Sequence, residues 1–124
     1  MRPCRIIHHR TGWFERGDIY TAATGTGFGG KPRPVLIIQS DAFPTRSKLL
    51  VALIGSPVEG TAPVRVDIAP DSANTLRVAS QVMTDILLPV RPDQFGRHVG
   101  HLSPGDMRRV DQALLLFLGI GTAI

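Results

Sequence analysis

Runs of apolar residues separated by turn residues divide much of this chain into short strands. Residues 35–38 and 49–54 contain no polar side chain, which is typical of strands that are buried on both faces. Residues 64–68 instead alternate apolar and charged side chains, and this period of two predicts a strand with one exposed face. The pattern therefore indicates a protein built mainly from β-strands.

Further strands are expected at 19–22, 80–88 and 97–102, and the strand around 35–38 is expected to extend over 34–39. Within 80–88, Val82 and Ile86 are predicted to share one face. Glycine-rich residues 23–32 are expected to form a long mobile loop. Short strands at this spacing predict a compact barrel of mostly antiparallel strands.

The end of the chain has a helical period. Ser103 can cap a helix, Pro104 suits the first helical position, and Asp106 adds an acid to the first turn. Gly119 is expected to end the helix. The apolar stripe predicted to pack on the barrel consists of Met107, Val110, Leu114 and Phe117.

Length and composition indicate a single domain. The chain has 124 residues, of which 43% are hydrophobic, enough to form the core of one small domain. Residues 1–15 show no clear period and are expected to be an N-terminal extension, which is compatible with disorder. Residues 16–120 are predicted to form the domain, followed by a short tail at 121–124.

The charge balance favours partners that carry phosphate. Fourteen Lys and Arg against ten Asp and Glu give a net charge of +4, and all of these cations except Lys31 and Lys48 are arginine. A solvated basic surface explains the same charge equally well. Cys4 is the only cysteine, which excludes an intramolecular disulfide and fits a reducing compartment. Because no apolar run approaches the roughly 18 residues of a membrane span, we expect a cytoplasmic protein that binds no membrane.

The sequence gives little support for a nucleotide-binding loop, a histidine metal site or a two-metal nuclease site. The glycines at 25–30 lack the Gly-Lys-Ser/Thr ending of a phosphate-binding loop and precede a strand. His98 and His101 are three residues apart in an extended segment, so they are expected on opposite faces. With two glutamates, Glu15 and Glu59, and no carboxylate cluster, a two-metal nuclease is poorly supported. We therefore expect no metal site and no cofactor.

Arg33 has the most distinctive surroundings, since it stands between Pro32 and Pro34 directly before a buried strand. Both prolines fix φ at about −65° and remove N–H donors, so the arginine is expected at a stiff junction. A cation in this position is either an ordinary surface charge or a guanidinium ready to bind an anion such as phosphate.

Four segments occur in a fixed order: Arg16-Gly17-Asp18-Ile19-Tyr20, the stretch 30–41 around Arg33, Ser80-Gln81-Val82-Met83-Thr84-Asp85, and Val99-Gly100-His101-Leu102-Ser103 before the helix. Together they resemble the MazF/PemK toxins, the endoribonuclease toxins of type II toxin–antitoxin systems. The resemblance covers 16–120. It implies an SH3-like small β-barrel with a C-terminal helix, a homodimer, and metal-independent, sequence-specific cleavage of single-stranded RNA. It also implies a MazE/PemI-like antitoxin whose disordered tail covers the RNA groove.

The resemblance also assigns site residues. Arg33 matches the family's catalytic arginine, whose guanidinium would stabilise charge on the phosphate in the transition state. The family's second catalytic group is usually a threonine after the third strand, where this chain has Gly55-Ser56. Either Ser56 supplies the hydroxyl from one position later, or the second group is lost. The cations expected to flank the groove, as RNA contacts or as solvated charges, are Lys31, Arg46 and Lys48.

The chain differs from the pattern of many MazF/PemK toxins at two places, and two other classes of protein remain as alternatives. No acid occurs between Ile19 and Arg33, so the glutamate that many relatives carry there has no counterpart, and Asp85 is followed by an apolar stretch. A gyrase-inhibiting toxin of the CcdB type shares the fold, but its helix ends in Trp-Gly-Ile where this chain has 118–120, Leu-Gly-Ile. A non-catalytic RNA-binding module is the other alternative. An RNA cleavage assay distinguishes all three.

Overall fold

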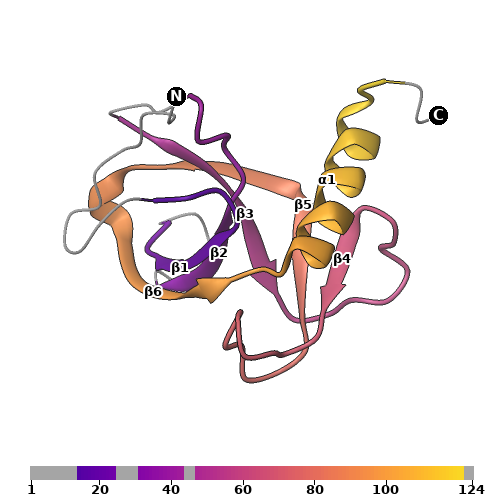
Figure 1. The fold of residues 1–124 in the computed structure, drawn as a ribbon, viewed down its shortest axis with the longest axis horizontal. Coiled ribbons are helices and arrows are strands. Elements are labelled where there is room, and N and C mark those ends of the chain that lie inside the picture. Colours follow the sequence, from indigo (N-terminus) through magenta and orange to yellow (C-terminus); the bar gives the residue numbers. More distant parts are fainter. Residues whose placement is uncertain (1–13, 25–30, 44–46, 122–124) are drawn as a thin grey trace.

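The computed structural model describes residues 14–24, 31–43 and 47–121, which form an antiparallel sheet and one α-helix (Figure 1). A short 3-10 helix, η1 (Pro92–Gln94), precedes the last strand. The other elements are β1 (Asp18–Ala22), β2 (Arg33–Ile37), β3 (Leu49–Gly55), β4 (Arg65–Ile68), β5 (Ser80–Val90), β6 (Phe95–His101) and α1 (Pro104–Leu118). Every strand and the helix predicted from the sequence is present, with bounds that shift by a few residues.

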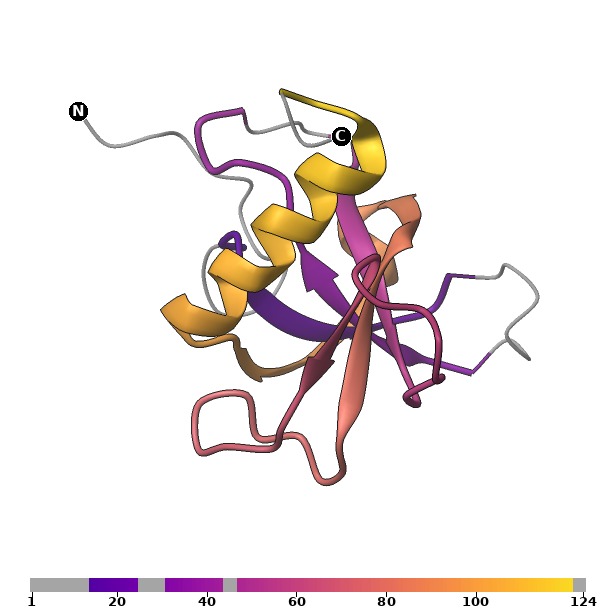
Figure 2. The ribbon, with the colours of Figure 1, turned by 90° about the vertical axis from the view of Figure 1, so that its right-hand side faces the viewer.

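The six strands form one curled sheet in the order β4-β5-β3-β2-β1-β6 (Figures 1 and 2). Within the described residues β4 and β6 do not pair with each other, so the sheet stays open. The loop between β4 and β5 instead reaches across to β6: the N–H of His101 donates to the carbonyl of Ala73 at 3.1 Å, and the hydroxyl of Thr75 donates to the carbonyl of Val99. The predicted class, mainly β with a C-terminal helix, is confirmed.

The sheet buries both of its faces. Leu36 belongs to a core cluster that includes residues of α1, such as Val110, whereas its neighbours Val35 and Ile37 belong to a second cluster on the other face. This explains why the sequence of β2 is an unbroken apolar run, since side chains that point in opposite directions along a strand both enter a core.

A bulge in β5 changes which side chains share a face. Leu87 pairs with Ala52 of β3, but the next residue of β3, Leu53, pairs with Met83. The three extra residues in β5 reverse the alternation, because an odd number of inserted residues turns the following side chains to the other face. Val82 therefore lies in the cluster with α1 and Ile86 packs against the other, so the prediction of a shared face was wrong.

The helix begins and ends as its sequence predicts. The Ser103 hydroxyl accepts a hydrogen bond from the N–H of Asp106 at 3.2 Å, and Gly119 has the left-handed φ of 69° at the C-terminal end. Val110 and Leu114 are buried, but Phe117 is 46% exposed, so its assignment to the packed stripe was wrong. The reason is tertiary: Figure 1 shows the last turns of α1 extending beyond β4 and β5.

Two further contacts define the N-terminal side of the domain. Phe14 is buried and lies 5.0 Å from the ring of Tyr20 and 4.7 Å from that of Phe95, so the packed region includes part of the predicted extension. Residues 1–13 lie outside the described residues. The guanidinium of Arg16 joins the residue after β2 to the helix, donating to the Ile38 carbonyl at 2.7 Å and to Asp111 at 2.6 Å. No helix in the described part of the chain has the length and apolar character to cross a membrane.

Candidate active site

Arg33 lies at the end of the sheet where β2 begins and β3 ends. It is exposed and pairs with Ala22 of β1. The antiparallel pairing of β2 with β3 ends at Val35 and Leu53, so Arg33 and Gly55 each lie two residues beyond it, at the same end of the strand pair. Ser56 follows Gly55 directly and is also exposed. The topology thus brings the two predicted catalytic residues, Arg33 and Ser56, to the same end of one strand pair.

The predicted cations divide between the two ends of β3. Lys31 precedes Arg33 and is exposed at the same end. Lys48 comes directly before Leu49, so the whole of β3, seven residues, separates it from Ser56. At about 3.3 Å per residue this is roughly 20 Å or more. Arg46, like most of the glycine-rich loop, lies outside the described residues.

Gly55 has no space for a side chain without a neighbour moving. A Cβ atom built on Gly55 would lie 2.1 Å from the methyl carbon of Met83, which is the partner of Leu53 in the adjacent strand. The end of the Met83 side chain therefore occupies the position of the missing side chain. Because a methionine has three flexible side-chain torsions, it can rotate away from a new side chain, unlike a backbone atom.

The loop that follows Ser56 is attached to the sheet by Gln81. This side chain is 4% exposed, and its residue pairs with Gly55 on one side and with Asp67 on the other. The side-chain oxygen of Gln81 accepts a hydrogen bond from the N–H of Val58 at 3.2 Å. The side-chain nitrogen of Gln81 donates to the backbone carbonyl of Val58 at 3.1 Å and to the carboxylate of Asp67 at 2.9 Å. No clear signal for this role was present in the sequence, because β5 carries other polar side chains as well, namely Ser80, Thr84 and Asp85.

Arg65, the arginine of β4, forms an ion pair close to the hydrogen bonds of Gln81. Arg65 donates to both oxygens of Asp85, at 3.0 and 3.1 Å. The hydrogen bonds from Arg65 hold the pKa of the Asp85 carboxyl below its usual range. The carboxylate therefore remains charged at neutral pH, and Arg65 already has an anionic partner.

A second acidic group lies at the other end of β1. Asp18 is close to His98, with 3.6 Å between the carboxylate and the imidazole Nε2, and burial raises the pKa of the Asp18 carboxyl. Asp18 pairs with His101, whereas Ala22, four residues along β1, pairs with Arg33. The Asp18 carboxylate is therefore at the opposite end of β1 from Arg33, and His98 pairs with Tyr20 in the middle of the strand.

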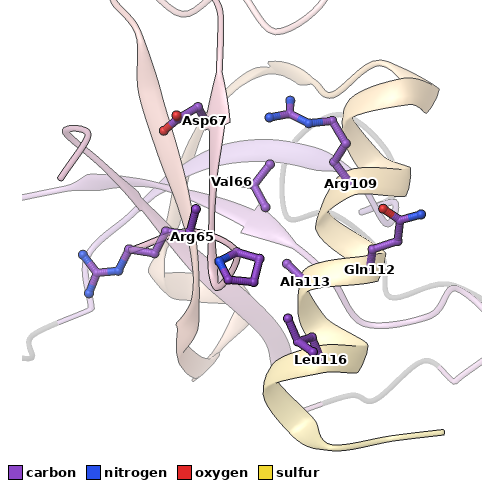
Figure 3. A pocket seen from close by; sticks show the side chains of 9 residues that line it. Arg65, Val66, Asp67, Arg109, Gln112, Ala113 and Leu116 are labelled. Atoms are coloured by element: carbon purple, nitrogen blue, oxygen red, sulfur yellow. The ribbon is translucent and has the colours of Figure 1, made fainter. Parts of the chain in front are cut away.

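A cavity of about 310 Å³ opens between the edge strand β4 and the helix (Figure 3). Val66, Ala113 and Leu116 form its apolar lining, and Figure 3 shows the Arg65 guanidinium directed away from α1. Arg33 and Ser56 are not among its lining residues. The cavity is therefore separate from the end of the sheet that carries the predicted catalytic residues.

A curled, open antiparallel sheet with a C-terminal helix and an exposed arginine at the start of β2 agrees with the class of small toxins that the sequence resembles. The family described as PemK-like, MazF-like toxins of type II toxin–antitoxin systems matches residues 15–118, and the chain belongs to this family. This confirms the family predicted from the sequence and favours it over the CcdB-type alternative.

Comparison with known proteins agrees with this assignment. A protein of Mycolicibacterium smegmatis named "Probable endoribonuclease MazF" is 42% identical over 106 residues, which cover 86% of this chain and 97% of that protein. A mycobacterial endoribonuclease solved with its cognate antitoxin has a TM-score of 0.71 at 22% identity, covering 88% of this chain and 98% of its own. The MazE–MazF structure from Deinococcus radiodurans gives 0.66 at 17% identity, covering 87% and 97%. At these identities the two structures support the fold alone.

Proposed function

We propose that this chain, a MazF-like toxin endoribonuclease, cuts single-stranded RNA at short sequence motifs without a metal ion. Family membership and the curated relative support RNA as the substrate. The observation that carries the proposal is the position of Arg33, exposed at the start of β2 and at the same end of the β2–β3 pair as Ser56. A fixed cation beside a hydroxyl is suited to a reaction at a phosphate.

The proposed reaction uses the RNA's own 2′-hydroxyl as the nucleophile. The 2′-hydroxyl gives up its proton to solvent as its oxygen attacks the adjacent phosphorus, the bond from phosphorus to O5′ breaks, and the leaving O5′ takes up a proton from solvent. Negative charge increases on the non-bridging oxygens, where the Arg33 guanidinium donates two hydrogen bonds. Ser56 is proposed as the second group at the phosphate and Lys31 as a phosphate contact. Lys48 and Arg46 are proposed to contact phosphates further along the strand.

Cleavage is expected to continue in excess EDTA, because attack by a neighbouring hydroxyl needs no metal-bound water. The products should carry a 2′,3′-cyclic phosphate or 3′-phosphate and a 5′-hydroxyl, which end-labelling and mass spectrometry can identify. Activity that EDTA abolishes, or equal cleavage of single-stranded DNA, would contradict the proposed mechanism.

Ser56→Ala is expected to slow cleavage if the serine hydroxyl acts at the phosphate. Gly55→Thr restores the hydroxyl at the family's usual position and should leave the cleavage rate unchanged or raise it. Because the new Cβ would lie 2.1 Å from the Met83 methyl, the full increase is expected only in the double variant with Met83→Ala. Turnover of the three variants on one RNA substrate tests this. A wild-type cleavage rate in Ser56→Ala would show that this turn takes no part in the reaction.

The chain is further proposed to act as a homodimer that an acidic, disordered antitoxin tail inhibits. The net charge of +4 supports competition between such a tail and RNA for the same cations, and two structures of similar fold are described with antitoxins. The affinity for the tail should fall as salt rises. Titration of the acidic segment of an adjacently encoded antitoxin against RNA cleavage, with light scattering for the dimer, tests both points.

A further inference from the structure

We propose that Gln81 is a positioning residue for RNA cleavage, because its buried amide holds the loop that carries Ser56 beside Arg33. We call residues 56–61 the Ser56 loop. The inference rests on the proposed function, which makes the end of β2 and β3 the reacting site. Gln81 itself is buried and does not reach the reacting atoms; it acts through the backbone of the loop.

Apart from its last residue, where the carbonyl of Thr61 accepts from the N–H groups of Val64 and Arg65, the Ser56 loop has little else to hold it in place. Residues 56–60 are all exposed, and the Val58 side chain is 50% exposed, so burial of apolar surface cannot determine where this segment lies. Both backbone groups of Val58 bind the Gln81 amide, at 3.2 Å for its N–H and 3.1 Å for its carbonyl. Ser56 is thus confined between the end of β3 and an anchor two residues later.

The anchor is stiff because several elements share it. Gln81 stands in β5 between β3 and β4. Its amide nitrogen shares two hydrogens among three acceptors, which are the Val58 carbonyl, the carboxylate of Asp67 in β4 at 2.9 Å and the hydroxyl of Thr61 at 3.2 Å. The Thr61 hydroxyl in turn donates to the Val58 carbonyl at 2.7 Å. A buried amide with several partners has one favoured orientation, since any other leaves polar groups unpaired. The position of Val58 therefore depends on this network, in which Gln81 is the side chain that binds both of its backbone groups.

Replacing Gln81 should affect turnover more than substrate binding. Arg33 and Lys31 lie on β2 and before it, so their contacts with RNA do not require the amide, whereas a displacement of Ser56 by about 1 Å can cost on the order of 100-fold in rate. Gln81→Met, which keeps the length and removes the hydrogen bonds, is expected to lower kcat by roughly 10- to 100-fold. KM should change little, and the Val58 amide should exchange its hydrogen faster.

Asn74 provides a matched control, because it is also a buried amide that organises a loop. Asn74 is fully buried. Its side-chain oxygen accepts from the N–H groups of Asp71 and Leu76, and its side-chain nitrogen donates to the backbone carbonyl of Ala69. The loop of Asn74 contacts His101, whose partner in β1 is Asp18 rather than Ala22. Asn74→Leu should lower thermal stability but leave kcat unchanged at a temperature where it is folded.

The experiment compares kcat, KM and amide hydrogen exchange for the wild type, Gln81→Met and Asn74→Leu. Wild-type kcat in Gln81→Met, or an equal loss of kcat in Asn74→Leu, would overturn the positioning role. If Gln81→Met does not fold, Thr61→Val decides, since it removes two hydrogen bonds of the network, to the Val58 carbonyl and from the Gln81 amide, with little change of shape; an unchanged kcat would then reject the inference. Wild-type protein that cuts no RNA would instead reject the proposed function itself.

Discussion

Arg33→Ala is expected to lower RNA cleavage by about 100-fold or more, the usual scale for losing one group that meets transition-state charge. Arg33→Lys should recover little of this loss, because a point charge cannot replace two parallel hydrogen bonds from a planar guanidinium. The measurement is single-turnover cleavage of a defined RNA. Arg33 is exposed at the beginning of its strand, so its loss should leave the fold intact.

The matched control is Arg108→Ala, which removes one positive charge from the exposed face of α1. It changes the net charge by the same amount as Arg33→Ala, so it separates a local effect from weaker attraction of RNA to a less basic protein. Circular dichroism of each variant checks that the fold is retained. Unchanged turnover in Arg33→Ala would place the reaction elsewhere on the molecule.

Gly100→Ala is expected to cause the largest loss of stability among conservative substitutions in β6. A Cβ at this position would lie 2.4 Å from the carbonyl oxygen of Ala73 and 2.7 Å from that of Asn74. Both neighbours are backbone atoms that cannot rotate aside, so the loop must move away from the strand. Overpacking of this kind costs roughly 1–3 kcal/mol, which lowers the midpoint of thermal unfolding by roughly 4 °C or more.

Gly105→Ala is the control, because it adds the same methyl group where space exists. The nearest atom, a guanidinium nitrogen of Arg108, would lie 3.8 Å from the new Cβ, and the position is in the first turn of α1. Alanine favours a helix over glycine, so the midpoint should stay the same or rise. Equal midpoints for Gly100→Ala and wild type would show that the loop does not depend on close contact with β6.

The positions of the strands and the helix were predictable because their signals are local. The alternation in 64–68 and the unbroken run in 49–54 depend only on which neighbours in the chain are apolar, and the observed β4 and β3 lie within one residue of these ranges. The capping of α1 by Ser103 is a contact between residues three apart. Such features need no knowledge of the rest of the fold.

The errors arose where distant segments decide the outcome. The bulge that separates Val82 from Ile86 is defined by pairing with β3, and the exposure of Phe117 depends on where the sheet ends beneath the helix. Phe14 showed no periodic signal because it packs against Tyr20 and Phe95, which come from two different strands. None of these partners can be read from the immediate sequence.

The sequence by itself determined the family, the class of fold and the candidate role of Arg33, since each depends on residue types and spacings within short segments. Only the tertiary structure decided that Ser56 shares an end of the sheet with Arg33, that Lys48 does not, and that the Gln81 side chain is hydrogen bonded to the Ser56 loop. These relations follow from strand register and from the burial of an amide against its partners. Both are set by pairing between segments far apart in the chain, which a local pattern does not encode.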